Sequence, residues 1–286
     1  MTTDQDDRAA RDRDRELRDR DLRDRTAAEL AAFLQEACLD DPWTDDPAAS
    51  SRLRYAPDGF LYTAERLRLH EELLAEHTAR TPAPPDDGTL AVVVTAGPPG
   101  AGKTTALARM PELDDYRHID ADDFKDPLLE RAAADGLLDA WTSRVLADGR
   151  PVQRRELAGY VHAESTAVAD TLRRRSLRDG ENVVVHGTLS SVDYLDDLLS
   201  DLDEAGYDRL RIVDVEVPLG SALEQATERW WQVRRGGDPL GGRFVPEAAI
   251  RRYYPADGGS RCRSNASELE RRATDLGWHV TVERIG

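Results

Sequence analysis

From residue 89 to the end of the chain, short apolar runs alternate with longer amphipathic stretches. Short apolar runs predict strands at Leu90–Thr95, Tyr116–Ile119, Asn182–His186, Leu210–Val217 and His279–Val282. Longer amphipathic stretches predict helices between them, notably at Gln153–Arg178, Val192–Ala205, Ser221–Val233 and Ala266–Leu276. Uninterrupted apolar strands are typical of sheets covered on both faces, and strands separated by helices pair in parallel. The pattern therefore predicts an α/β fold whose parallel sheet is covered by helices on both faces.

The chain before residue 89 has a different pattern. Residues 1–25 are rich in Asp and Arg and hold too few apolar positions to bury a core, so we expect a charged, disordered tail. The alternative is a solvated helix, because the alternating charges allow i,i+4 ion pairs. Residues 26–80 predict a helical extension in which Thr26 caps a first helix, Asp40–Ser51 forms turns, and Thr63–Thr78 forms a second helix. The proline-rich residues 81–88 form a stiff linker, which leaves 89–286 as the main domain.

Charge and cysteine content narrow the classes of partner and compartment. A net charge of −17 over 286 residues argues against a nucleic-acid backbone or an anionic membrane as the main partner. No apolar run approaches the ~20 residues of a membrane span. Cys38 and Cys262 form no disulfide or metal-binding pattern, which is typical of a cytoplasmic protein.

A glycine-rich turn joins the first predicted strand to the helix that follows it. Gly97, Gly102, Lys103 and Thr104 fill the pattern G-x-x-x-x-G-K-[ST] of a phosphate-binding loop. Glycines let backbone N–H groups turn toward phosphate oxygens, and the helix presents its positive end to the same anion. The alternative is a plain glycine turn beside a solvated lysine. We expect ATP to bind at the loop, whose residues are Gly97, Pro98, Pro99, Gly100, Ala101, Gly102, Lys103, Thr104 and Thr105.

Carboxylates follow the second predicted strand. Alternation along an extended segment points Asp120 and Asp122 to the same side, and Asp123 follows them. We expect Asp122 to act as the general base for an acceptor hydroxyl, and Asp120 with the Thr104 hydroxyl to hold Mg²⁺. The alternative is a cluster that caps the next helix, because Asp is a favoured N-cap residue.

Two other segments supply candidate substrate contacts. The third strand ends in His186-Gly187-Thr188, where Thr188 is expected to meet the acceptor and His186 is either a core residue or a contact. Glu164, within the helix predicted before that strand, either faces the cleft and binds substrate or lies on a solvated face.

Arginines are concentrated after the fourth strand. We expect Arg229 and Arg243 to stabilise the transferring phosphoryl group from a lid whose hinges are the glycine pairs at 236–237 and 241–242. The alternative is a flexible loop with surface arginines.

These motifs resemble those of the zeta toxin family of P-loop kinases. The resemblance spans roughly residues 89–255 and rests on the phosphate loop at 97–105, the segment Ile119–Lys125, Gly187-Thr188, Arg229 and Arg243. It implies a kinase that uses ATP and Mg²⁺ to phosphorylate the 3′-hydroxyl of the sugar in UDP-N-acetylglucosamine. It also implies an antitoxin protein as a partner. Family members usually carry an acidic residue where this chain has His186.

By position, the resemblance implies that Lys103 binds the ATP phosphates and that Asp122 accepts the hydroxyl proton. It implies that both arginines stabilise the transferring phosphoryl group. Two other functions stay open: a P-loop kinase for another alcohol, such as an antibiotic, nucleoside or sugar, and a non-catalytic ATP-binding regulatory protein. The helices of 26–80 either cap the main domain or cover its nucleotide cleft in cis.

Overall fold

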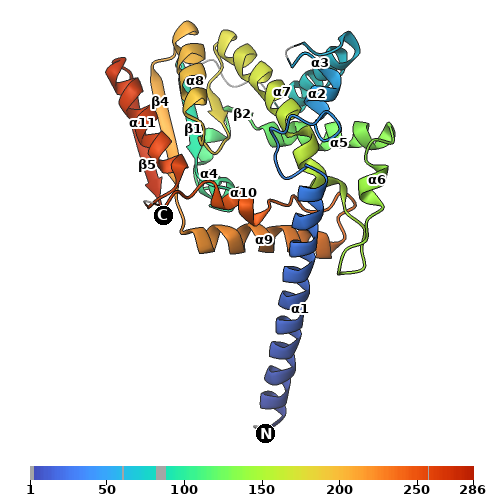
Figure 1. The fold of residues 1–286 in the computed structure, drawn as a ribbon. Helices are drawn as coiled ribbons and strands as arrows, with labels where there is room; N and C mark the ends of the chain where they lie inside the picture. The colour runs from blue at the N-terminus through green and yellow to red at the C-terminus, as the bar shows by residue number, and fades with distance from the viewer. Residues whose placement is uncertain (1–2, 60, 82–87, 257) are drawn as a thin grey trace.

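A five-stranded sheet organises the part of the chain that the structure describes, residues 3–59, 61–81, 88–256 and 258–286 of a computed structural model (Figure 1). All its strand pairs are parallel, in the order β2-β3-β1-β4-β5. The strands are β1 (Ala91–Ala96), β2 (Arg117–Ile119), β3 (Val183–Val185), β4 (Arg209–Val215) and β5 (His279–Ile285). The predicted fold class is confirmed, and each predicted strand is present with shifted ends.

Alternate side chains of the strands pack against helices on opposite faces of the sheet. Val92 and Val94 point toward α7 (Ala158–Arg178), α8 (Val192–Glu204) and α11 (Arg261–Asp275). Val93 points toward α4 (Lys103–Leu107) and the 3₁₀ helix η1 (Pro111–Leu113). Both faces therefore carry helices, but α4 is only five residues long and covers its face incompletely.

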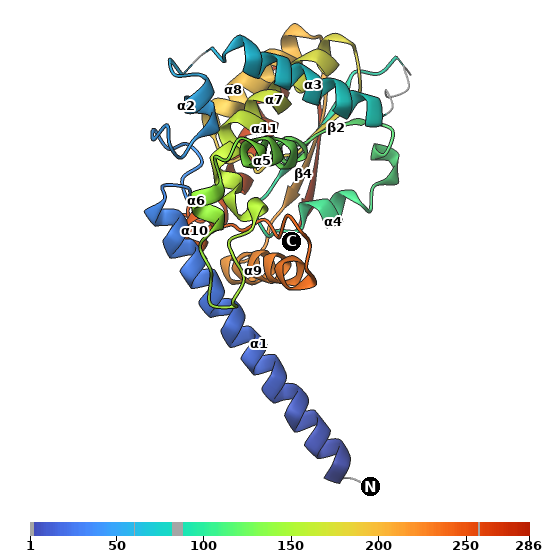
Figure 2. The same ribbon diagram turned by 90° about the vertical axis from the view of Figure 1, so that its right-hand side faces the viewer.

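The remaining helices surround the carboxyl ends of the strands (Figure 2). The predicted helix over 153–178 divides into η3 (Arg154–Leu157) and α7. The others are η2 (Ala121–Phe124), α5 (Lys125–Ala134), α6 (Asp139–Thr142), α9 (Leu219–Gly236) and α10 (Glu247–Arg251).

The N-terminal segment is one long helix, α1 (Thr3–Glu36), whose first turns project from the rest of the molecule (Figure 1). Over residues 3–25 the structure therefore has the helix alternative in place of the expected disordered tail. Alternating charges support the helix through i,i+4 ion pairs such as Arg25–Asp21 at 3.1 Å. Thr26 does not cap a helix: its hydroxyl donates to the Leu22 carbonyl at 2.7 Å within α1.

Two further helices, α2 (Ser51–Tyr55) and α3 (Ala64–Arg80), complete the N-terminal extension. Thr63 caps α3 by accepting a hydrogen bond from the Arg66 N–H, close to the predicted start. Leu30, Leu34 and Leu73 belong to the same hydrophobic cluster as the sheet residue Val92. The extension therefore shares its core with the sheet, whereas most of the predicted linker, residues 82–87, lies outside the described residues.

Arg23 fastens α1 to α9. Its guanidinium is 5% exposed and donates to Glu224 and Glu228, both at 2.8 Å. In the described part of the chain, no helix is both long enough and apolar enough to cross a bilayer.

Candidate active site

The glycine loop lies at the carboxyl end of β1 and is pressed against two other elements. Gly97 and Gly100 have φ of 143° and 85°, values that residues with a side chain rarely adopt. A Cβ at Gly97 would stand 2.4 Å from the Val215 carbonyl oxygen, and one at Gly100 would stand 2.3 Å from that of Ala222 in α9. The loop therefore requires glycine at both positions.

The loop presents backbone donors around the Lys103 ammonium. Within the described residues, the N–H groups of Gly100, Gly102, Lys103 and Thr104 have no protein acceptor. The Lys103 Nζ donates to the carbonyls of Gly97 (2.6 Å) and Pro98 (3.1 Å). Burial lowers the pKa of Lys103 to about 8, and the positive charge of Arg229 contributes. Because α4 is a single short turn of helix, we expect these N–H groups and Lys103, rather than the helix dipole, to dominate anion binding.

The end of β3 is bonded directly to the loop. The Gly97 N–H donates to the Thr188 carbonyl at 3.1 Å, and the Gly187 N–H donates to the Thr95 hydroxyl at 2.9 Å. The Thr188 hydroxyl donates to Ser190 Oγ at 3.0 Å. Thr188 therefore lies beside the loop, with its hydroxyl bonded to a neighbouring serine, and its contact with the acceptor stays a prediction.

Asp120 and Asp122 have different roles in the structure. One carboxylate oxygen of Asp120 accepts the Asp122 N–H at 2.8 Å and caps η2, which is the capping alternative. The Asp122 carboxylate meets Lys125 at 2.8 Å and Arg243 at 2.6 Å. Burial would raise the pKa of Asp122, but the charges of Lys125 and Arg243 outweigh it and hold that pKa well below its usual range. Asp122 is therefore ionised and already paired with one of the two predicted arginines.

Arg229 is exposed on α9, and no side-chain partner is found for it in the described part of the chain. It lies close enough to Lys103 for its charge to lower the pKa of that lysine. Lys103, Asp122 and both arginines therefore converge on one region, at the carboxyl edge of the sheet.

The glycine pair at 241–242 serves close packing rather than hinge motion, whereas a Cβ at Gly236 or Gly237 would meet no atom within 4 Å. A Cβ at Gly241 would lie 2.4 Å from Gln153 Oε1, and one at Gly242 would lie 2.5 Å from the Trp230 carbonyl oxygen. Gly237, with φ of 81°, ends α9 in the left-handed region. The expectation of hinges is therefore wrong at 241–242, where the chain is held against η3 and α9.

Glu164 does not face a substrate cleft. Its side chain is 0% exposed and accepts hydrogen bonds from Arg66 Nη2 (2.9 Å) and pairs with His70 Nε2 (2.7 Å), both from α3. Burial alone would raise the pKa of Glu164, but these bonds bring it down to about 2. The expected substrate contact at Glu164 is therefore corrected to a buried bridge between α7 and the N-terminal extension.

His186 is neither a fully buried core residue nor free. Its Nε2 lies 2.8 Å from His118 Nδ1, and its Nδ1 lies 3.8 Å from the Asp120 carboxylate. Burial lowers the pKa of His186, and the charge of Lys103 contributes. His186 therefore borders the loop at the place where the family resemblance implies an acidic residue.

Several site residues were not found by sequence reasoning. Lys125 ends the segment Ile119–Lys125 but was given no role, and no pattern in the sequence marks Asp126 or Arg155. Asp126 pairs with Arg155 at 2.7 Å and lies 3.5 Å from Arg243. A lone arginine 29 positions beyond Asp126 gives no sequence signal, because its contacts exist only after folding.

Oxygen ligands for Mg²⁺ are present but few. The described residues contain no group of three or more His, Cys, Asp or Glu side chains arranged to hold a metal ion. The exposed Thr104 hydroxyl and the Asp120 carboxylate are hard oxygen donors, which suits a Mg²⁺ ion that keeps most of its waters and binds phosphate oxygens.

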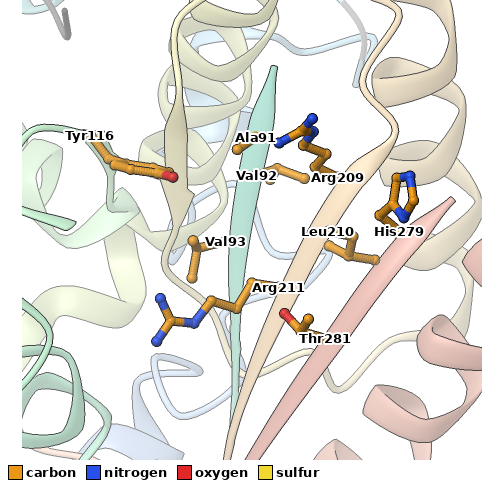
Figure 3. A pocket seen from close by; sticks show the side chains of 9 residues that line it. All are labelled: Ala91, Val92, Val93, Tyr116, Arg209, Leu210, Arg211, His279 and Thr281. Atoms are coloured by element: carbon orange, nitrogen blue, oxygen red, sulfur yellow. The ribbon is translucent and has the colours of Figure 1, made fainter. Parts of the chain in front are cut away.

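A cavity of about 360 Å³ opens on the α4 face, lined by strand residues such as Arg209, Arg211 and His279 (Figure 3). It lies over the amino-terminal halves of β4 and β5, away from the loop. Arg211 there pairs with Glu112 at 2.9 Å. We therefore assign the chemistry to the carboxyl edge, where ligands bind in parallel sheets.

A glycine loop that holds a lysine, opposed by an ionised carboxylate and arginines at the carboxyl edge of a parallel sheet, defines a P-loop kinase. The sequence model of the family "Zeta toxin" matches residues 75–274, more than half of the chain, and the chain belongs to this family. No curated protein sequence matches it.

Solved structures show the same fold. A structure from the PezAT chromosomal toxin-antitoxin system of Streptococcus pneumoniae has a TM-score of 0.50 at 15% identity, over 78% of this chain and 79% of that chain. The AvrRxo1-ORF1:-ORF2 complex has a TM-score of 0.52 at 18% identity, over 79% of this chain and 65% of that chain. The same complex with ATP has a TM-score of 0.50 at 17% identity, over 82% and 67%.

Proposed function

We propose that this protein transfers the γ-phosphoryl group of ATP to an alcohol, with the 3′-hydroxyl of the sugar of UDP-N-acetylglucosamine as the acceptor. The observation that carries the proposal is the pairing of Asp122 with Arg243 at 2.6 Å in the region of the Lys103 loop. Membership of the zeta toxin family and the ATP complex of the similar AvrRxo1 structure support it. A protein that only bound ATP would need neither Asp122 nor Arg243.

In the proposed reaction, the acceptor oxygen forms a bond to the γ-phosphorus while the bond from the γ-phosphorus to the β–γ bridging oxygen breaks, and ADP leaves. The backbone N–H groups of Gly100, Gly102, Lys103 and Thr104, together with the Lys103 ammonium, hold the phosphates. Arg229 and Arg243 stabilise the charge that spreads over the γ-oxygens.

The low pKa of Asp122 suits a carboxylate that orients the acceptor hydroxyl and takes its proton late. A loose transition state leaves most of the O–H bond intact until the phosphoryl group has moved. Lys125 and Arg243 keep Asp122 ionised, so it is ready to accept a hydrogen bond.

Mg²⁺ would be held by the Thr104 hydroxyl and, through water, by Asp120. It would supply charge neutralisation at the phosphate oxygens. The capping bond from the Asp122 N–H uses one Asp120 oxygen and leaves the other available.

A different alcohol is the second candidate acceptor. Glu164 is sealed inside the protein and His186 replaces the acidic residue that the family resemblance implies, so the acceptor pocket of this chain differs in chemistry. An antitoxin is the proposed protein partner, because one similar structure belongs to a toxin-antitoxin system.

The test uses the purified full-length chain with ATP, Mg²⁺ and UDP-N-acetylglucosamine, and mass spectrometry of the product. We expect a sugar 3′-phosphate and an equal amount of ADP. Asp122→Asn should lower the amount of product about 10²–10³-fold. Asp123→Asn, which changes a neighbouring carboxylate that forms no ion pair with Arg243 in the described part of the chain, should retain most of it. ADP formation with other alcohols alone would move the proposal to the second acceptor class, and turnover with none would refute the kinase.

A further inference from the structure

Arg155 of η3 contacts two separate segments at once. Its Nε and Nη2 donate to the Asp126 carboxylate at 3.0 and 2.7 Å. Its Nη1 donates to Asp238 Oδ2 at 3.0 Å and to the Gly241 carbonyl at 3.2 Å. Its backbone N–H donates to the Leu240 carbonyl at 2.8 Å. One residue thus ties the segment 238–241 to the first turn of α5.

The segment that Arg155 holds leads directly to Arg243. Arg243 Nη2 donates to the Asp122 carbonyl at 2.6 Å and lies 3.5 Å from Asp126 Oδ1. Asp126 therefore lies between two guanidinium groups, that of Arg155 and that of Arg243 at the proposed site. A shift of Arg155 would displace Asp126 and the segment 238–241 together, and both changes would reach Arg243.

Only a guanidinium fits this position. It presents several N–H donors in a planar fork, whereas a lysine ammonium is a compact point charge that cannot reproduce the bidentate pair with Asp126 together with the bonds to Asp238 and the Gly241 carbonyl. The hydrogen bonding to Asp126, followed by the hydrogen bond to Asp238, raises the pKa of Arg155, so the group keeps its charge. Its side chain is only 24% exposed.

We infer that Arg155 is a positioning residue: it fixes the segment 238–241 so that Arg243 stands beside Asp122 before substrates bind. This inference rests on the proposed function, in which Arg243 stabilises the transferring phosphoryl group. Charge stabilisation is most effective when the donor is already in place, and a displacement of about 1 Å can cost about 10²-fold in rate.

The position of the segment is tested without any turnover, by hydrogen exchange of the full-length protein. Arg155→Lys should raise amide exchange in a peptide over 238–243 at least tenfold and leave a peptide over β1 unchanged. Arg154→Lys is the matched control, since its exposed neighbouring side chain has no partner in the described part of the chain. Unchanged exchange in Arg155→Lys would overturn the inference.

Kinetics separate positioning from a general structural role. Arg155→Lys should lower kcat with UDP-N-acetylglucosamine at least tenfold and change KM for ATP by less than twofold. In an Arg243→Ala background, Arg155→Lys should cause less than a further twofold loss, because the residue it positions is already absent. Asp238→Asn neutralises one of the two carboxylates that bind Arg155 and should give a smaller loss of the same kind.

Multiplicative losses in the double variant would show that Arg155 acts on its own, through the fold or by touching substrate, and would overturn the inference. If the wild-type protein phosphorylates no acceptor, the proposed function fails, and the exchange experiment alone decides whether Arg155 holds the segment.

Discussion

The buried bridge between α3 and α7 allows a quantitative prediction. Arg66→Met removes the charged partner of Glu164, and both side chains are buried: that of Arg66 is 4% exposed and that of Glu164 is 0% exposed. Charges about 4 Å apart attract by about 4 kcal/mol at an effective dielectric constant of about 20. Breaking a buried pair from one side costs about 3–5 kcal/mol because the remaining charge is left without its partner. His70 stays bound to Glu164, so we expect the lower end, about 3 kcal/mol.

The same two helices provide a matched control. Glu71 of α3 pairs with Arg175 of α7 at 2.6 Å, but the two side chains are 60% and 39% exposed. Glu71→Gln should therefore cost less than about 1 kcal/mol. Thermal unfolding of the full-length protein at pH 7, followed by circular dichroism, should show Tm lower by about 6–12 °C for Arg66→Met.

The pH dependence gives an independent check. The pKa of Glu164 is lowered to about 2 in the folded protein, so its stabilisation is complete above the ordinary glutamate pKa. This stabilisation is lost as the pH falls from the ordinary glutamate pKa through about 2. The Tm difference between wild type and Arg66→Met should narrow over that range. If Arg66→Met unfolds within about 2 °C of Glu71→Gln at pH 7, the reasoning about burial is refuted.

Three further predictions concern the site and the extension. Asp122→Asn should lower kcat about 10²–10³-fold while ATP affinity, measured by calorimetry, stays unchanged; an equal loss of affinity would contradict the assigned role. Gly100→Ala should abolish ATP binding in the same assay, because its Cβ would meet the Ala222 carbonyl at 2.3 Å; normal affinity would show that the loop tolerates a side chain. Gly159→Ala should lower Tm because its Cβ would lie 2.2 Å from the Leu39 carbonyl, although alanine usually stabilises a helix by about 1 kcal/mol relative to glycine. A higher Tm would contradict this prediction and would mean that the N-terminal extension shifts to make room for the methyl group.

Local signals predicted the loop and the strands, because each depends on a few consecutive residues. The Lys103 loop follows from glycine geometry, and the strands follow from β-branched apolar runs. Asp122 and Arg243 were both expected to act on the transferring phosphoryl group, and their side chains form a 2.6 Å ion pair.

The errors have a common cause in long-range contacts. Glu164 looked available because its partners, Arg66 and His70, lie 98 and 94 positions away. The glycines at 241–242 looked like hinges because Gln153 and Trp230, which require them, are distant in sequence. The tail over residues 3–25 looked disordered because its support comes partly from Glu224 and Glu228. Local sequence composition does not indicate a contact with a distant residue that forms only in the folded state.

The attachment of α1 to α9 has a consequence for synthesis of the protein. Arg23 is translated early, and its acceptors Glu224 and Glu228 are translated 201 and 205 positions later. At about 5–20 residues per second, α1 waits about 10–40 s for its docking surface to be translated. During that interval its dense, alternating charges keep the emerging segment hydrated. The composition that is typical of a disordered tail therefore also suits a helix that is synthesised long before it can dock.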